Sequence, residues 1–393
     1  MKQVDSNVKS FFALFKLKNE GKFDQKVRLP KYKPRGDEGY CTLTFTKKAF
    51  RFNSRKDHVI LTLPKYMKKK FKVNNKILKF KLPKAFRGVA TKRIRQIELV
   101  PHYNANFFTI NFSYEIPILK DSIDKFEKKT KSELFNPSLA ESDIYRTLAI
   151  DIGVKNLLSM VNCMTGESII IDGKSLNSHN RYINKEIARL KSNLASFYSN
   201  KAKTSKRIQR LLIQREDYIK DFFHKIAVYL IQYCKNKDLK HIVIGKNPEF
   251  KQEVDIGKQN NQNLTMIAHS KLIDYLVDKA RLQGIVVEVI EESYTSKVDA
   301  LANEAVKKQL IYLGKRVKRG LFQSSTNKVI NADINGSLNI FRKWKKSKGR
   351  DDSLSGEIVC SGRVYRPYRV VFFNGRLIKR SLLNQLASIT SSD

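Results

Sequence analysis

The chain has 393 residues, enough for two or three domains with cores of their own. Its hydrophobic content of 41% is that of a folded protein and argues against intrinsic disorder. Lysine and arginine number 77 against 37 acidic residues, which leaves a formal net charge of +40. A compact body with that charge repels itself unless a polyanion neutralises it. Since the sequence contains no run of about 18 apolar residues, no signal peptide and no isolated basic tail, we expect nucleic acid as the partner and no membrane.

The four cysteines are far apart in the sequence. Cys41, Cys163, Cys234 and Cys360 form no CxxC pair. This spacing argues against a zinc ribbon and gives no disulfide framework. With no export signal, we expect the chain to reside in the cytoplasm.

Residues 1–18 are predicted to form a helix, because apolar side chains recur at three- and four-residue spacing. The residues of this apolar face are Val4, Val8, Phe11, Phe12 and Phe15. Such a face normally packs against a neighbour, and the sequence offers no upstream element.

Between residues 26 and 117 the hydrophobic pattern changes to period two, which predicts strands. The predicted strands are 40–52, 58–64, 77–83 and 107–117. Lysines at alternate positions indicate a small barrel with a basic outer face. The alternative is that these lysines are simply the solvated face of a sheet.

Residues 118–143 are polar and weakly patterned, and we expect a linker there. The predicted strands that follow are 147–156, 157–163, 168–173, 241–245 and 285–292, and the predicted helices are 180–198, 204–235, 269–284 and 331–346. This is the order expected of an RNase H-like fold: three strands in a meander, then helices, strand, helix, strand and helix. Beyond residue 346, only 368–373 is predicted as a strand.

Acidic residues stand where apolar elements of this second part begin or end. Asp151 follows an apolar strand, and an aspartate there is costly unless it is paired or binds a metal. Its alternative role is to cap a turn. Asp333 begins a helix and could simply be the N-cap. Glu291 and Glu292 end a strand and could be a solvated tip. Two-metal cleavage of a phosphodiester needs several such carboxylates at ions that lie about 3.5–4 Å apart.

Six motifs occur in the order found in one nuclease family. They are IDIGVKN (150–156), IVIGKNPEFKQEVDIGKQNNQ (242–262), IAHSKLIDYL (267–276), EESYTSK (291–297), GKRVKRGLF (314–322) and NADINGSLNI (331–340). Together they resemble the RuvC nuclease of the TnpB family, the transposon-encoded RNA-guided DNA nucleases related to type V CRISPR effectors. The resemblance spans nearly all of 145–345.

The resemblance implies an α+β protein with an N-terminal OB-like, wedge-type barrel and an RNase H-like (RuvC) domain. The implied parts are a helix remaining from a recognition lobe (1–22), the basic barrel (23–117), the linker (118–143), the nuclease domain (144–346) with an inserted nucleic-acid-binding loop (293–330), and a C-terminal extension (347–393).

By position, Asp151 and Asp333 match the first and last catalytic aspartates of the family. Gly245 occupies the position of the family's usual middle glutamate. A subset of the family supplies a glutamate just before the TS dipeptide instead. Glu292, three residues before Thr295, matches that arrangement, with Glu291 in reserve. The resemblance thus implies a Mg²⁺-dependent endonuclease in which the trio holds two ions. It also implies guide RNA and double-stranded DNA as partners, in a prokaryotic cytoplasm at the nucleoid.

Further residues are expected to contact nucleic acid. They are Lys155, Asn156, Lys246, Lys297, Arg316, Lys318, Arg319 and Asn335. The basic residues of 293–330 could instead be an ordinary solvated charge run. Tyr294 could stack on a base, although a core position is the alternative.

Three departures from the family pattern stand out. Residues 293–330 contain no cysteine, so no zinc is expected. The early recognition helices and first barrel strand have no counterpart. The stretch VDALANEA (298–305) replaces a more polar loop. Three alternatives to a guided nuclease therefore remain: a cleavage-incompetent, truncated or domesticated relative that binds RNA and DNA, a guide-independent RuvC nuclease such as a junction resolvase, and an inert transposon remnant.

Overall fold

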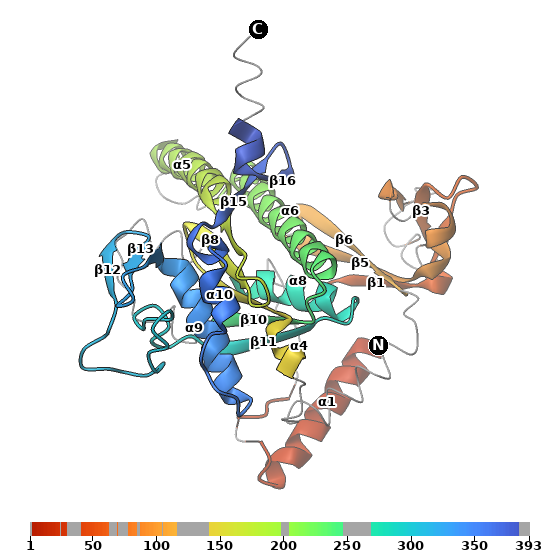
Figure 1. Ribbon diagram of the computed structural model, residues 1–393. Helices are drawn as coiled ribbons and strands as arrows, with labels where there is room; N and C mark the ends of the chain where they lie inside the picture. Colours follow the sequence, from red (N-terminus) through yellow and green to blue (C-terminus); the bar gives the residue numbers. More distant parts are fainter. Residues whose placement is uncertain are drawn as a thin grey trace. The chain divides into compact units, whose positions relative to one another are not determined.

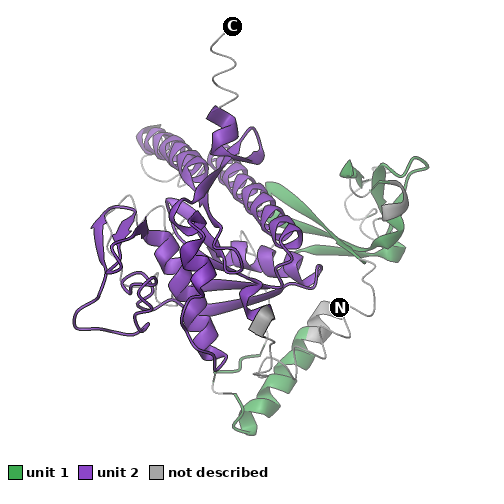
Figure 2. Cartoon of the chain, in the orientation of Figure 1, with its two compact units in different colours: residues 1–117 green, residues 118–393 purple. Residues whose placement is uncertain are grey.

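The computed structural model divides the chain into two compact units, Met1–Pro117 and Ile118–Asp393 (Figure 2). The structure describes residues 2–23, 25–29, 41–62, 69, 78–84, 87–103, 105–115, 141–197, 204–246 and 269–384. The predicted linker at 118–143 therefore lies almost wholly outside the described residues, as do positions 247–262 of the second motif.

The first unit begins with helix α1 (Lys2–Asn19), where a helix over residues 1–18 was predicted. Phe11 stacks on Phe15 with 5.9 Å between the ring centroids. Phe12 and Phe15 are exposed, so the described part of the predicted apolar face is largely uncovered.

Two three-stranded sheets make up the rest of the described first unit. One has the order β1 (Leu43–Thr46), β5 (Ile94–His102), β6 (Phe107–Tyr114), and the other β2 (Phe50–Phe52), β3 (His58–Leu61), β4 (Leu78–Lys81). Both sheets contribute to one core, which includes Phe45, Val59 and Ile97.

The expected OB-like barrel is not closed among the described strands. A 3-10 turn, η1 (Lys47–Ala49), interrupts the predicted strand 40–52 and carries the chain from the first sheet to the second. The described strands thus form two separate ladders, which meet through their side chains.

A seven-stranded sheet organises the second unit (Figure 1). Its order is β11 (Val286–Glu291), β10 (His241–Lys246), β7 (Thr147–Ile152), β8 (Asn156–Asn162), β9 (Ser168–Asp172), β15 (Tyr368–Phe373) and β16 (Arg376–Lys379). Strands β7, β8 and β9 form the predicted antiparallel meander, and β10 and β11 run parallel to β7.

The two faces of this sheet bury different residues of the same strands. Leu148 and Ile150 belong to the core formed with α6 (Lys206–Asn236) and α8 (His269–Arg281). Ala149 belongs to the core formed with α9 (Ala332–Ser347). Because side chains alternate along a strand, residue 151 lies on the α9 face.

Residues 347–384 belong to the same unit and do not form a separate extension. Strand β15 pairs in parallel with β9, and β16 pairs with β15. The short helix α10 (Gly356–Cys360) and the 3-10 turn η4 (Arg363–Tyr365) bury Ile358 and Val364 in the α9-side core. Helices α4 (Glu141–Tyr145) and α5 (Lys174–Phe197) complete the unit.

None of the helices in the described part of the chain is long and apolar enough to span a membrane.

Candidate active site

Asp151 lies near the end of strand β7, against the first turns of α9. A Cβ atom at Gly336 of α9 would lie 2.7 Å from Asp151 Oδ2, so the helix backbone and the carboxylate are in close contact. The sequence places glycine where this approach requires the absence of a side chain.

The Asp151 carboxylate accepts no hydrogen bond from any described residue. Burial raises its pKa well above the usual range, the negative charges of Glu292 and Asp333 raise it further, and Arg316 opposes them. Directly opposite, Ser159 of β8 is buried with an unpartnered hydroxyl. These contacts do not support a turn-capping role for Asp151, because a cap would accept backbone N–H groups.

Asp333 lies in the first turn of α9 but does not cap the helix. The cap is Asn331, whose Oδ1 accepts from the backbone N–H groups of Asp333 at 3.0 Å and Ile334 at 3.3 Å. The Asp333 carboxylate is instead directed to other partners. Its Oδ2 accepts from Asn156 Nδ2 at 2.7 Å, and its Oδ1 lies 3.9 Å from Arg316 Nη2.

The two adjacent glutamates at the end of β11 point to different surroundings. Glu291 is exposed, and its carboxylate lies 3.8 Å from Lys343 Nζ. Glu292 is half-buried, its pKa is raised by that burial, and its charge acts on Asp151. Of the pair, Glu292 is the one that faces the aspartates.

The absence of a side chain at Gly245 leaves room for Glu292, which follows the neighbouring strand β11. A Cβ at Gly245 would lie 2.3 Å from Ile340 Cδ1 of α9 and 3.2 Å from Glu292 Cβ. The space beside β10 that a side chain at 245 would enter is therefore filled by Ile340 and Glu292.

The three acids have the donor chemistry of a magnesium site, because carboxylate oxygens are the ligands that this hard cation prefers. A partly buried carboxylate with two acidic neighbours and no hydrogen bond fits a bound divalent cation. As the described side chains stand, however, no group of three or more His, Cys, Asp or Glu is arranged around one metal position. Asp333 is engaged by Asn156 and Arg316 instead.

Most of the basic residues predicted to contact nucleic acid are at the surface. The exposed ones are Lys155, Lys246, Lys297, Arg316, Lys318 and Arg319. Lys246 Nζ donates to Ser270 Oγ at 3.4 Å. Tyr294 is also exposed, so a core position is wrong for it.

The two predicted asparagine contacts have other partners in the structure. Asn335 is fully buried, donates to Val298 O at 2.8 Å and accepts from Ala300 N at 3.0 Å, so its side chain is not available to nucleic acid. Asn156 donates to Asp333 and accepts from Arg369 at 3.0 Å. Its amide therefore belongs to the surroundings of the acidic trio.

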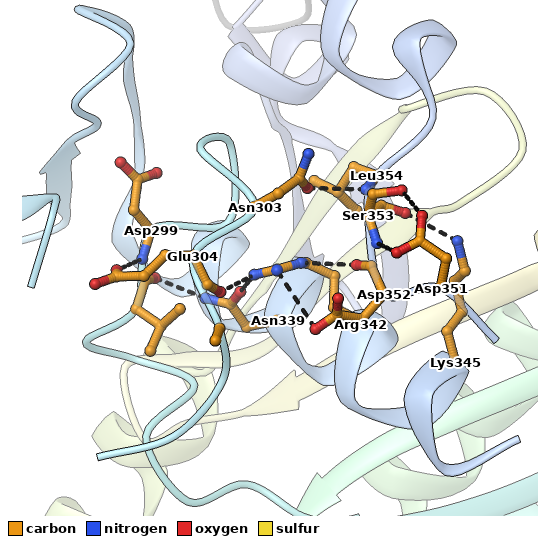
Figure 3. Close-up of polar contacts among 12 residues, drawn as sticks. Asp299, Asn303, Glu304, Asn339, Arg342, Lys345, Asp351, Asp352, Ser353 and Leu354 are labelled. Carbon is orange, nitrogen blue, oxygen red and sulfur yellow. Dashed lines mark hydrogen bonds and ion pairs between the residues drawn. The ribbon is translucent and has the colours of Figure 1, made fainter. Parts of the chain in front are cut away.

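The cysteine-free segment 293–330 is held by a buried polar network that the sequence did not reveal (Figure 3). Arg342 of α9 is fully buried and donates to Glu304 O at 2.7 Å, Asn339 Oδ1 at 2.9 Å and Asp352 O at 2.9 Å. Asp299, also buried, accepts from Ser324 Oγ and from the backbone of Ser325, both at 2.8 Å.

Three short strands complete this segment: β12 (Lys315–Lys318), β13 (Leu321–Gln323) and β14 (Val329–Asn331). The unusual stretch 298–305 supplies both buried acids, Asp299 and Glu304. Its departure from the family pattern was the available signal for the network. The sequence contains no signal for the role of Arg342, because a single arginine in a basic helix is ordinary.

Two family models match parts of the second unit. The family model described as a probable transposase, OrfB_IS605, matches residues 127–250. A model described as the Cas12f1-like TNB domain matches residues 269–340, which include Asp333 and the segment 293–330.

A viral protein and two solved structures are similar over most of the chain. The TnpB-like protein ORF457 of Acidianus two-tailed virus is 24% identical over 350 residues, covering 85% of this chain and 69% of the relative. A Cas12f1–sgRNA–target DNA complex and a CRISPR-Cas12f ternary complex each match at 15% identity and a TM-score of 0.36. They cover 85% and 86% of this chain, and 76% and 69% of their own.

Proposed function

Because the chain belongs to the TnpB family, we propose that it is an RNA-guided DNA endonuclease whose second unit is a RuvC-type, RNase H-like nuclease domain. The antiparallel meander β7–β8–β9, followed by the parallel strands β10 and β11, supports the RNase H-like assignment. We expect the protein to act in a prokaryotic cytoplasm, at the nucleoid.

The observation that carries this proposal is the meeting of three acids distant in sequence. Asp151, Glu292 and Asp333 come from a strand end, a loop start and a helix start, and the charges of the last two act on the first. Negative charge gathered in this way is costly without a cation. In a chain of net charge +40, these acidic neighbours support the proposal of a site for a positive ligand.

The proposed ligands are two Mg²⁺ ions, held by Asp151, Glu292 and Asp333. When bound, such a pair activates water and stabilises the leaving oxygen of a phosphodiester. Arg316 is the exposed cation next to Asp333, and its guanidinium suits a phosphate of the strand that enters the site. Asn156 orients the Asp333 carboxylate by its hydrogen bond.

Guide RNA and target DNA are the proposed partners. The net charge of +40 favours a polyanionic partner, and the resemblance to the TnpB family implies a guide RNA and a DNA target. A hybrid of guide and target would be bound through its shape and its phosphates, and base pairing would choose the sequence.

Cleavage of a matched plasmid by the purified chain with its co-purified RNA tests the proposal. We expect Mg²⁺-dependent cutting that Asp151→Ala and Glu292→Ala abolish while DNA binding persists. Glu291→Ala is the matched control, because this neighbour is exposed and paired with Lys343, and it should cut like the wild type. Loss of cutting with Glu291→Ala and retention with Glu292→Ala would contradict the assigned trio.

One observation favours a second candidate, a relative that binds RNA and DNA without cleaving. Asp333 is engaged by Asn156 and Arg316, and the described acids do not surround one metal position. This candidate predicts guide-dependent DNA binding with no cutting in Mg²⁺ or Mn²⁺. The same plasmid assay, run beside a gel-shift measurement, distinguishes the two.

A further inference from the structure

Residues 305–313 form a closed loop that presents two apolar side chains to solvent. Leu310 and Ile311 have relative exposures of 105% and 86%, and Leu313 follows at 59%. Side chains of this kind are usually at least partly covered, so two adjacent ones at full exposure require an explanation.

The base of the loop is fixed by one buried acid. Glu304 Oε1 accepts from the backbone N–H of Leu313 at 3.0 Å, while its Oε2 accepts from that of Asp299 at 2.7 Å. Arg342 donates to the backbone carbonyl of Glu304, which ties this junction to α9 (Figure 3). On the far side, Gly314 is buried so closely on Phe322 that a Cβ there would lie 2.5 Å from the ring.

Contacts inside the loop hold its shape up to the exposed pair. Gln309 Nε2 donates to Ala305 O at 3.2 Å, and the backbone N–H of Lys307 donates to the same carbonyl at 2.8 Å. The residues directly before the exposed pair are thus held by contacts within the loop.

The charge around the loop selects a polyanion as its partner. From residue 305 to residue 332 the sequence contains no acidic residue. The basic residues of this stretch are Lys307, Lys308, Lys315, Arg316, Lys318, Arg319 and Lys328. Arg316 also links strand β12 to the Asp333 carboxylate, so a strand bound along this surface leads to the candidate active site.

We propose that Leu310 and Ile311 are an apolar wedge that inserts between neighbouring bases of bound DNA, while the surrounding lysines and arginines hold its phosphates. Apolar side chains on a basic surface unstack a base step in this way and thereby bend or open the duplex. The proposal rests on nucleic acid as the partner of the proposed nuclease but does not require cleavage.

The test uses the full chain with its co-purified RNA in EDTA and short DNA duplexes carrying 2-aminopurine, whose fluorescence rises when it is unstacked. We expect the wild type to raise the fluorescence and Leu310→Ser/Ile311→Ser to lose most of that rise. The dissociation constant should change by less than about threefold, because the phosphate contacts supply most of the affinity. Leu310→Phe/Ile311→Phe should restore the signal.

Val277→Ser/Leu282→Ser is the matched control, since both residues are exposed and apolar, Val277 in α8 and Leu282 directly after it, and α8 packs on the sheet face opposite to α9. It should behave like the wild type. An undiminished fluorescence rise in the loop variant would overturn the wedge. A second outcome would also overturn it: the wild type gives no fluorescence rise but self-associates with increasing concentration, and the loop variant does not self-associate. The pair would then be a protein contact. Since no metal is present, a chain that fails to cleave can still pass this test.

Discussion

At the scale of single residues, Asp151 is a carboxylate whose surroundings disfavour its own charge. The nearest protein groups that act on it are two further acids and one arginine, and no described residue donates a hydrogen bond to it. In the absence of a cation, the ionised form therefore lowers the stability of the folded state.

Asp151→Asn should raise the melting temperature of the metal-free protein above pH 7. The pKa of Asp151 is raised in the folded chain, so its protonated form contributes to the stability of the fold. That contribution is complete below the ordinary aspartate pKa and is lost as the pH rises through the raised pKa. The gain should be about 2–4 °C for each ~1 kcal/mol of relieved repulsion. Thermal unfolding in EDTA at acidic and alkaline pH measures it. A variant that melts like the wild type at both pH values would show that the carboxylate is not under this repulsion.

Gly336→Ala should impair cleavage on the order of a hundredfold, the cost of moving a reacting group by about 1 Å. The new methyl group would lie 2.7 Å from Asp151 Oδ2, so the carboxylate must shift. Plasmid cleavage rates measure the effect, with Gly356→Ala as the control, since a Cβ at that glycine meets nothing within 4 Å. Equal rates for the two variants would place Asp151 outside the reaction.

At the scale of elements, the regularly patterned segments could be predicted, including the four-residue strands β3 and β4, and the irregular ones could not. The meander, α6, β10 and β11 lie within a few residues of their predicted bounds. Strand β5 was missed, because a bulge between Ile94 and Gln96 breaks its period-two pattern. Strands β12 to β14 were also missed; they have three or four residues each, and β12 consists of one valine among three basic residues.

The acids of the candidate site could be proposed from the sequence, with Glu292 chosen over Glu291 by the family resemblance, but their surroundings could not be predicted. Asp151, Glu292 and Asp333 stand at element ends, where an apolar pattern stops, and that position is visible in one dimension. The fit of Gly336 to Asp151 and of Gly245 to Ile340 depends on how α9 crosses the sheet. Asn335 was misassigned for the same reason, because only its burial shows that it serves the 298–300 backbone.

Arg342→Lys should destabilise the second unit by about 3 kcal/mol, the cost of leaving buried acceptors without their partner. Burial lowers the pKa of Arg342 and the nearby Asp352, Asp299 and Glu304 oppose that shift, so the charge depends on these contacts. Limited proteolysis should cut 299–313 first. Lys346→Met, an exposed position on the same helix, is the control. Unchanged proteolysis in Arg342→Lys would mean that the network does not hold this segment.

At the scale of the whole molecule, the dominant property is the excess of 40 positive charges. Two compact units share one charge sign, and the segment 305–332 has no acid at all. Association with nucleic acid should therefore be governed by the release of counterions.

Affinity for DNA should fall steeply with salt. For six to ten phosphate contacts, the loss is about 10³–10⁵ between about 50 and 200 mM salt. Fluorescence anisotropy across that range, with a labelled duplex, gives the slope of log affinity against log salt. Lys318→Gln/Arg319→Gln should reduce that slope by about two, one for each lost phosphate contact. A slope near zero would exclude phosphate binding as the source of affinity.

The position of Glu292 in the chain has a consequence for when the proposed nuclease can cut. Position 245 lies within strand β10, whereas Glu292 follows β11 and directly precedes the basic segment 293–330, in which Thr295 Oγ1 donates to the backbone carbonyl of Glu292 at 2.8 Å. Nucleic acid that binds to residues 293–330 is therefore expected to shift the backbone at Glu292. Under the proposed function, we therefore expect the third carboxylate to complete the metal site only when nucleic acid is bound to residues 293–330.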